Sequence, residues 1–428
     1  MLHRRKIGPY SPTGKIFIKL AEVVLSRSKL ETLKTILTSE YWLIASLCGA
    51  FFSFFALNRG GVVVFIDACI VFLFINFISG KYRLKDIPAS YWVTVAICGY
   101  LLGSSILFNP KTSHYRWMTY MVRMLGVVFA IHCLSLKKIG TWATILFFSL
   151  LSLAVIWHSA SYWFFHKLYG TYLNPHYLSS FLVLALPALV YSAIITRGLY
   201  RFCFVPAVLL DIDLLLRTAS RPAVFALAIS TTFFVVFLTK GWRRWGSLSL
   251  LCIILVGLYI FDYGTVYTRF EELIVNFSRE ERLQLWTSAW NMLKDNTLTA
   301  WIFGNGIGGG RSVFAEYIPD PRLKVLIFPH NYFLEICYEN GIIGAILVFG
   351  GLAVLLFYAI KTAKQTDNKN IRLLINCMVV AFITWLIHTG LTFPFYSKYS
   401  QYSLAFILGP LLAVLANKTL TLSETNSK

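Results

Sequence analysis

Apolar segments of 14 to 21 residues, close to the roughly 20 that cross a bilayer, recur along most of this chain and constrain its fold more than any other feature. Only helices or closed barrels satisfy every backbone group within hydrocarbon. The apolar residues run continuously and do not alternate with polar ones, which favours helices over a barrel. With 57% hydrophobic and 14% charged residues, the chain is too apolar for a soluble domain. We therefore expect an all-α integral membrane protein.

The apolar segments predict about twelve transmembrane helices. They lie at 41–57, 61–79, 91–108, 117–136, 140–160, 177–195, 202–216, 222–239, 246–261, 342–360, 373–389 and 402–415. One large polar loop, 262–341, separates the ninth span from the tenth. The predicted organisation is a basic cytoplasmic tail (1–40), nine spans (41–261), the large loop (262–341), three spans (342–416) and a short cytoplasmic tail (417–428).

Lysine and arginine predict the orientation of the chain, because cytoplasmic loops retain positive charge. With the N-terminus inside, the basic residues gather in the N-terminal tail and the inner loops, so the large loop faces the outside. This distribution and anionic lipid headgroups account for the net charge of +20, and we expect no nucleic-acid partner. We also expect no cleavable signal peptide, since a long polar stretch precedes the first span.

No metal or cofactor is expected from the sequence. The eight cysteines have no Cys-x-x-Cys spacing and fall within or beside apolar spans, which predicts small buried hydrophobic residues and not metal ligands or disulfides. The glycine-rich run 304–310 has no strand before it and no Lys-Ser or Lys-Thr after it, so it is a weak nucleotide signature. A flexible turn explains it better, with a backbone amide nest for an oxyanion as the alternative.

Two helix starts are predicted within the large loop. The residues from Ser278 form a capping box, so a helix should begin there and carry Arg282 and Trp286 on one face. Pro329 favours a second start, with His330 in its first turn and the helix running on into the tenth span. A histidine at the membrane rim, with an ordinary pKa of roughly 6.5, suits a general base, although a lone histidine is more often structural.

Arginines in or beside the apolar spans need anionic partners, because arginine inside hydrocarbon is costly. Arg123 lies within the fourth span, where an ion pair with Asp67 or another aspartate explains it as well as substrate binding does. Arg221 has no acidic neighbour in the sequence and precedes Pro222, which should open a helix. A diphosphate would supply its missing anion, since the planar guanidinium suits phosphate oxygens. Arg217 is close enough along the chain to assist.

Together these motifs resemble the O-antigen ligase and O-antigen polymerase superfamily. The resemblance covers most of the chain from about Gly170 onward, and the order and placement of its short motifs are specific. Many members carry a second Asn where this chain has His176, so this segment receives little weight as a site. The motifs are Gly170-Thr171-Tyr172-Leu173-Asn174-Pro175-His176-Tyr177, Thr218-Ala219-Ser220-Arg221-Pro222, Arg282-x-x-x-Trp286, Phe303-Gly304-Asn305-Gly306-Ile307-Gly308, and Pro329-His330-Asn331-Tyr332-Phe333-Leu334 running into Glu339-Asn340-Gly341-Ile342-Ile343-Gly344.

The resemblance implies a metal-independent glycosyltransferase at the periplasmic face of the Gram-negative inner membrane. Members take a polysaccharide from undecaprenyl diphosphate, and the ligases pass it to a sugar of the lipid A core. By resemblance, Arg221 and Arg282 hold the diphosphate and His330 is the essential histidine. We expect His330 to act as the general base of an inverting transfer. The further residues expected to bind substrate are Arg217, Arg123, Asn331 and Trp286, the last being alternatively an anchor in the membrane interface.

Other functions stay open at this stage. We favour a ligase over a polymerase because polymerases of this superfamily tend to have two sizeable outer loops, and only one is large here. A protein O-oligosaccharyltransferase is a third reading within the superfamily. A polyprenyl-lipid transporter is the non-enzymatic alternative, but the chain lacks matched broken helices and midplane ionisable residues in two halves.

Overall fold

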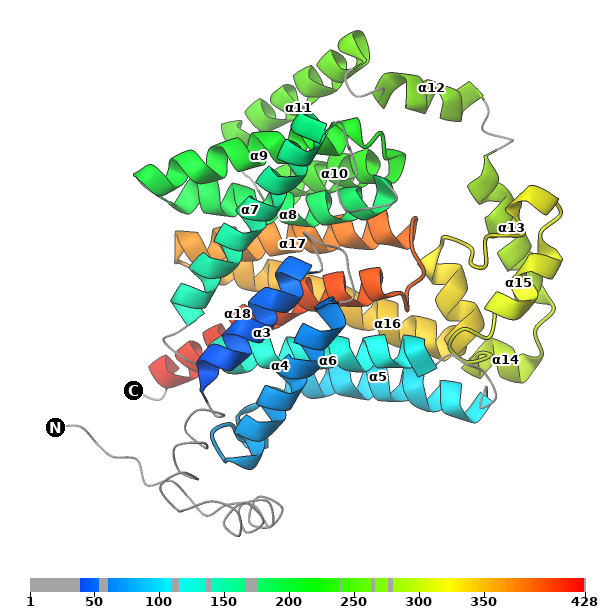
Figure 1. The fold of residues 1–428 in the computed structure, drawn as a ribbon, viewed down its shortest axis with the longest axis horizontal. Coiled ribbons are helices and arrows are strands. Elements are labelled where there is room, and N and C mark those ends of the chain that lie inside the picture. Colours follow the sequence, from blue (N-terminus) through cyan, green and yellow to red (C-terminus); the bar gives the residue numbers. More distant parts are fainter. Residues whose placement is uncertain are drawn as a thin grey trace.

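The computed structural model describes residues 39–426 apart from 54–60, 109–114, 136–139, 166–174, 197, 239–240, 263–265 and 276–279. Its regular elements are all helical, and no strand occurs among the described residues. The long helices run side by side as a bundle, and shorter helices gather at one end of it (Figure 1). The expected all-α class is therefore confirmed.

A helix lies at each of the twelve predicted spans. These helices are α3 (Glu40–Phe52), α4 (Gly61–Ile78), α5 (Ala89–Phe108), α6 (Tyr115–Ser135), α7 (Gly140–Phe165), α8 (Pro175–Ile195), α9 (Leu199–Arg217), α10 (Arg221–Phe233), α11 (Trp242–Phe261), α16 (Tyr332–Gln365), α17 (Lys369–Gly390) and α18 (Lys398–Asn426). Within the described residues, seven are long and apolar enough to cross a membrane, namely α4, α5, α6, α8, α16, α17 and α18. The chain is thus a multi-pass membrane protein, while the count of twelve crossings stays a prediction.

The helices differ in how deeply they are enclosed. Helix α18 packs along α6, and α8 packs against both α9 and α17. Helices α18 and α8 are the most buried of the candidate membrane spans. Polar side chains link central helices, as in the bonds from Thr384 Oγ1 to Ser230 Oγ (2.6 Å) and from Trp385 Nε1 to Ser403 Oγ (2.9 Å). Large apolar side chains cover the outside, such as Phe202 at 77% exposed. A surface of this kind is suited to lipid.

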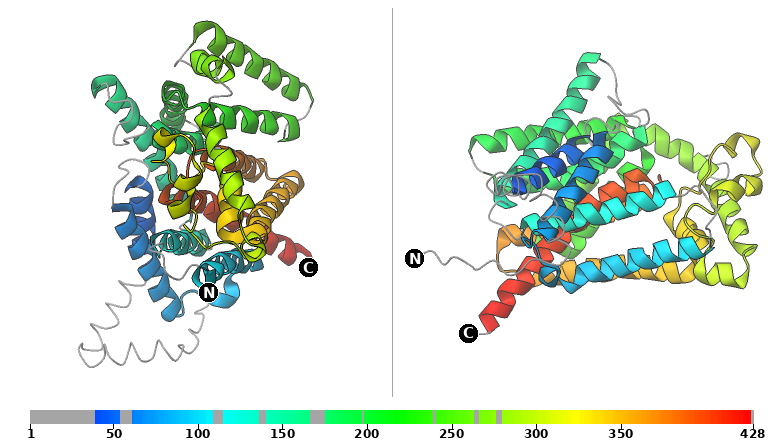
Figure 2. Two further views of the ribbon diagram at one scale, coloured as in Figure 1. Left: turned by 90° about the vertical axis from the view of Figure 1, so that its right-hand side faces the viewer. Right: turned by 60° about the horizontal axis from the view of Figure 1, so that its bottom comes forward.

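The polar segment 262–341 forms α12 (Val266–Val275), α13 (Glu281–Lys294), α14 (Leu298–Phe303), α15 (Arg311–Tyr317) and the 3₁₀ turn η6 (Pro321–Leu323). Helices α13 to α15 lie together at one end of the bundle, beside the beginning of α16 (Figures 1 and 2). Helices α13 and α14 both contact α16. The ring of Phe303 also stacks on Phe108 at the end of α5, with 5.7 Å between centroids. The segment is thus packed onto the helix ends.

Both helix starts predicted in this segment are wrong in detail. Helix α13 begins at Glu281 with Glu280 as its N-cap and no side-chain capping bond, and Ser278 lies outside the described residues. Helix α16 begins only at Tyr332, because the Asn331 side chain caps it and His330 adopts a left-handed φ of 52°. It is also interrupted at Gly341, so the second helix does not run unbroken into the tenth span.

Two expectations about small residues also need correction. Cys203 and Cys252 are exposed, although they were predicted to be buried, because they lie on the outer faces of α9 and α11. The glycine-rich run is more than a flexible turn, since the amides of Asn305 and Gly306 donate to the carbonyls of Tyr338 (2.9 Å) and Glu339 (2.7 Å). These bonds hold the turn firmly on α16.

Candidate active site

Arg221, Arg282 and His330 converge at the end of the bundle that carries the polar segment. They come from the first residue of α10, the first turn of α13 and the loop before α16. Arg282 lies close enough to Arg221 and to His330 for its charge to act on both. The fold therefore brings together the three residues that the sequence identified as the catalytic group.

Arg221 is held by an acidic residue that the sequence analysis did not assign to it. Its Nη2 lies 3.4 Å from Glu280 Oε1 and 3.3 Å from Glu280 Oε2. The expectation that Arg221 lacks an acidic neighbour is thus wrong in three dimensions, because Glu280 is far along the chain and meets it only through folding. The ion pair links the polar segment to the helical bundle.

Arg282 is a partly buried guanidinium that makes no hydrogen bond or ion pair with the described residues. Burial lowers its pKa, as does the nearby Arg221, while Glu280 and Glu281 oppose this effect. An unpaired charge away from water is costly unless an anion accompanies it. Arg282 is therefore the side chain of this cluster best placed to bind an incoming anion.

His330 is fixed by its backbone and by one ring nitrogen. Its Nδ1 lies 2.6 Å from the carbonyl oxygen of Thr392, and its ring packs on Phe328 at 4.4 Å. A carbonyl can only accept, so Nδ1 carries the proton and Nε2 keeps its lone pair. Burial lowers the pKa of His330 to about 4, the bond to Thr392 raises it and the charge of Arg282 lowers it. The imidazole is thus neutral at pH 7 and can accept a proton at Nε2.

Two further histidines border this cluster. His176 Nδ1 lies 3.2 Å from Ser220 Oγ, directly before Arg221, and His176 is within electrostatic range of the three converging residues. His388 of α17 is fully buried, with Nε2 3.1 Å from Ser179 Oγ. From the sequence, His176 was given little weight as a site residue and His388 was not predicted to be one. The available signal was a histidine in or at the start of an apolar span, a position that commonly marks a functional site.

The other two arginines are held in ion pairs of their own. Arg123 Nε and Nη2 lie 2.7 and 2.9 Å from the two carboxylate oxygens of Asp67. Arg217 Nε donates to Asp213 at 2.9 Å, and its Nη1 donates to the hydroxyl of Tyr162 at 3.0 Å. For Arg123 this geometry supports the ion-pair alternative. Neither guanidinium is as available to a ligand as that of Arg282.

The remaining two predicted residues have local roles that the structure makes visible. Asn331 Oδ1 accepts the amide of Leu334 at 3.2 Å, which is the N-cap bond of α16. Trp286 is partly buried against the core, and its Nε1 has no hydrogen-bond partner among the described residues. Nowhere among the described residues are three His, Cys, Asp or Glu side chains grouped so that they could hold a metal ion.

Comparisons with known proteins point to one superfamily. Residues 206–349 match the family model of the O-antigen ligases, a region that contains Arg217, Arg221, Arg282 and His330. A general O-oligosaccharyltransferase of Acinetobacter baylyi is 24% identical over 275 residues, which are 59% of this chain and 45% of that protein. The chain therefore matches less than half the length of this relative. The family match, the relative and the membrane fold together support membership of the O-antigen ligase superfamily.

Proposed function

We propose that the protein is an O-antigen ligase, a glycosyltransferase that moves O-antigen polysaccharide from undecaprenyl diphosphate to a sugar of the lipid A core. The observation that carries this proposal is the guanidinium of Arg282, which is unpaired among the described residues and lies near Arg221 and His330. A partly buried guanidinium with no partner among the described residues is suited to bind the diphosphate of such a donor. Metal ions have no part in the proposed reaction.

The chemistry follows from the types of these three residues. The acceptor hydroxyl attacks the anomeric carbon of the donor, its O–H proton passes to His330 Nε2, and the bond from that carbon to the diphosphate breaks. Arg282 and Arg221 stabilise the negative charge that develops on the departing diphosphate. Attack opposite the leaving group inverts the anomeric centre. Arg221 would exchange Glu280 for a phosphate oxygen when the donor binds.

We place this site at the periplasmic face of a Gram-negative inner membrane. The support is the excess of Lys and Arg in the tail and loops predicted to be cytoplasmic, which directs the polar segment outward. Since Arg221 belongs to the bundle and Arg282 to the polar segment above it, the donor lipid would enter from the side, between the two.

The test is a transfer assay with purified protein in lipid, a polyprenyl-diphosphate-linked glycan and a lipid A-core acceptor. His330→Ala, Arg221→Ala and Arg282→Ala should each lower kcat/KM by about 100-fold or more, the usual loss for a general base or a charge-stabilising group. Arg322→Ala is the matched control, because Arg322 is an exposed arginine of the same segment and pairs with nearby Asp320. Normal transfer by His330→Ala would disprove the role of His330.

A protein O-oligosaccharyltransferase is the second candidate, because the relative of Acinetobacter baylyi carries that name. A strain lacking the protein separates these functions. Loss of a ligase leaves the lipid A core bare while long lipid-linked chains accumulate, whereas loss of an oligosaccharyltransferase leaves pilin-type proteins without glycan. Single-unit caps on the core would indicate a polymerase, and a protein that moves lipid-linked glycan without transferring it would be a transporter.

A further inference from the structure

The turn between α17 and α18, residues 391–397, is the element that orients His330. The Thr392 carbonyl accepts the proton of His330 Nδ1 at 2.6 Å. Three residues further on, the amide of Phe395 donates to Glu335 Oε2 at 2.8 Å. His330 and Glu335 lie just before and just inside the first turns of α16, so the turn 391–397 is attached to that region at both points.

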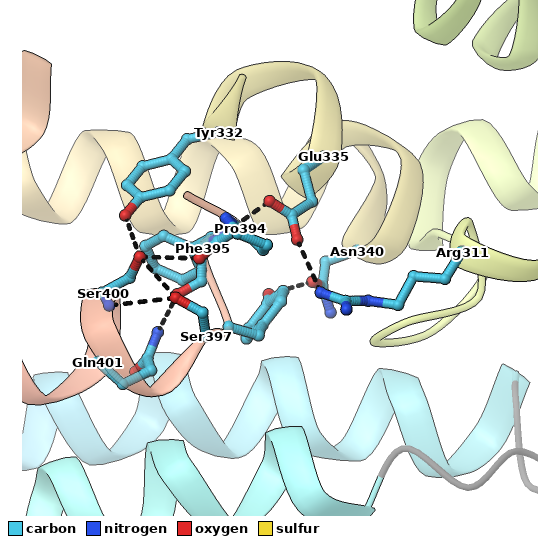
Figure 3. A network of polar contacts seen from close by, with 10 residues as sticks. Arg311, Tyr332, Glu335, Asn340, Pro394, Phe395, Ser397, Ser400 and Gln401 are labelled. Atoms are coloured by element: carbon cyan, nitrogen blue, oxygen red, sulfur yellow. Dashed lines mark hydrogen bonds and ion pairs between the residues drawn. The ribbon is translucent and has the colours of Figure 1, made fainter. Parts of the chain in front are cut away.

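Further bonds tie this turn to its surroundings, and Figure 3 shows them together. The Ser400 hydroxyl donates to the Pro394 carbonyl at 2.8 Å, and Gln401 Nε2 donates to the Phe395 carbonyl at 2.8 Å. The Tyr396 hydroxyl donates to Asn340 Oδ1 in α16. Because these residues are buried, water offers few alternative hydrogen-bond partners to the polar groups of the turn.

The second carboxylate oxygen of Glu335 faces an arginine. Its Oε1 lies 3.8 Å from Nη2 of Arg311, at the start of α15. The guanidinium of Arg311 lies over the ring of Trp117 in α6, 3.6 Å from the ring centroid. Glu335 therefore contacts the polar segment through one oxygen and the α17–α18 turn through the other, and it is only 4% exposed.

We propose that Glu335 is a positioning residue for His330, acting through the Phe395 amide and the Thr392 carbonyl. This inference rests on the proposed function, in which His330 Nε2 takes the proton of the acceptor. Without the Glu335 acceptor, a buried amide would lose its partner and the turn would relax. Thr392 would then no longer hold the proton on Nδ1. A proton on Nε2 would block the lone pair that the reaction uses.

Three variants separate positioning from bulk stability. Glu335→Gln keeps an acceptor oxygen for the Phe395 amide, whereas Glu335→Met has a similar length and no such acceptor. Glu339→Met is the matched control, since Glu339 lies one turn further along α16 and is also buried. Glu339 accepts from the backbone of Gly308 in the glycine-rich run, which lies outside the turn 391–397.

The transfer assay should resolve kcat from the KM of the donor. Glu335→Met should lower kcat by about 10- to 100-fold, the range found for residues that orient a metal-ligating histidine, with the donor KM unchanged. Glu335→Gln should stay near the wild-type kcat. The inference is overturned if Met and Gln variants are equally active, or if Glu339→Met lowers kcat as much as Glu335→Met does.

A second measurement does not depend on activity. The ¹⁵N spectrum of histidine-labelled protein reports which ring nitrogen of His330 carries the proton, and His330→Asn identifies its signals. Wild type and Glu335→Gln should show the proton on Nδ1, and Glu335→Met a mixture of tautomers. An unchanged His330 spectrum in Glu335→Met overturns the positioning role. If His330→Asn transfers normally while Glu335→Met alters the spectrum, the proposed function fails and the positioning role stands.

Discussion

Replacement of Gly341 by alanine should break the junction between the polar segment and α16. Gly341 has φ 67° and ψ −175°, a backbone conformation that is essentially restricted to glycine. A Cβ atom there would lie 2.2 Å from the Ile302 carbonyl oxygen and 2.6 Å from the Phe303 amide nitrogen. Opposite Gly341, at the C-terminal end of α14, Gly304 has φ 86° and ψ 177°, and a Cβ there would lie 2.3 Å from the Glu339 carbonyl oxygen.

The cost of Gly341→Ala can be estimated from these two effects. The unfavourable dihedral angles contribute about 1–3 kcal/mol. The clash is with backbone, which cannot rotate away, and forced displacement in a packed site costs about 1–3 kcal/mol more. A total loss of about 2–6 kcal/mol is a large share of the roughly 5–15 kcal/mol by which folded proteins are usually stabilised. The segment carrying Arg282 would also shift relative to His330.

The measurement is thermal unfolding of the purified protein together with the transfer assay. Gly350→Ala is the control, because Gly350 lies in the same helix and an added Cβ there meets nothing within 4 Å. We expect Gly350→Ala to behave as wild type, and Gly341→Ala to unfold at a lower temperature and transfer poorly at any temperature. Wild-type stability and transfer in Gly341→Ala would refute the reasoning.

Three further predictions concern charged groups. Because the pKa of His330 is lowered to about 4, kcat/KM should stay nearly constant from pH 7 to 5. An ordinary histidine would already have lost about 90% of its neutral form at pH 5.5. A pH profile of kcat/KM with its midpoint near 6.5 would therefore contradict this prediction. Glu280→Gln, which frees Arg221, should lower the donor KM or leave it unchanged, and a several-fold rise would show that the ion pair is needed for binding. Arg123→Met should cost roughly 0.5–1 kcal/mol of stability, measured by chemical unfolding, and the double variant with Asp67→Leu should recover most of this loss. Equal losses in both variants would exclude the ion pair as the cause.

The sequence located the helices well because the signal is local and continuous. Each predicted span overlaps a helix, since a long apolar run is a signal carried by neighbouring residues. Helix starts were less accurate. The start at Pro329 failed because a good N-cap, Asn331, lies two residues further on. His330 instead has a left-handed φ and bonds through its ring to Thr392. Such a bond has no pattern in the local sequence.

The sequence by itself determined the fold class and the chemical types available to the site, because both depend on which residues are present and how they repeat. The tertiary structure decided which of these residues act together. Arg221 meets Glu280 across 59 positions, Phe395 meets Glu335 across 60 and His330 meets Thr392 across 62. Hydrogen bonds and ion pairs require atoms within about 3–4 Å of each other. Only the packing of α10, α13, α16 and the α17–α18 turn at one end of the bundle provides that proximity.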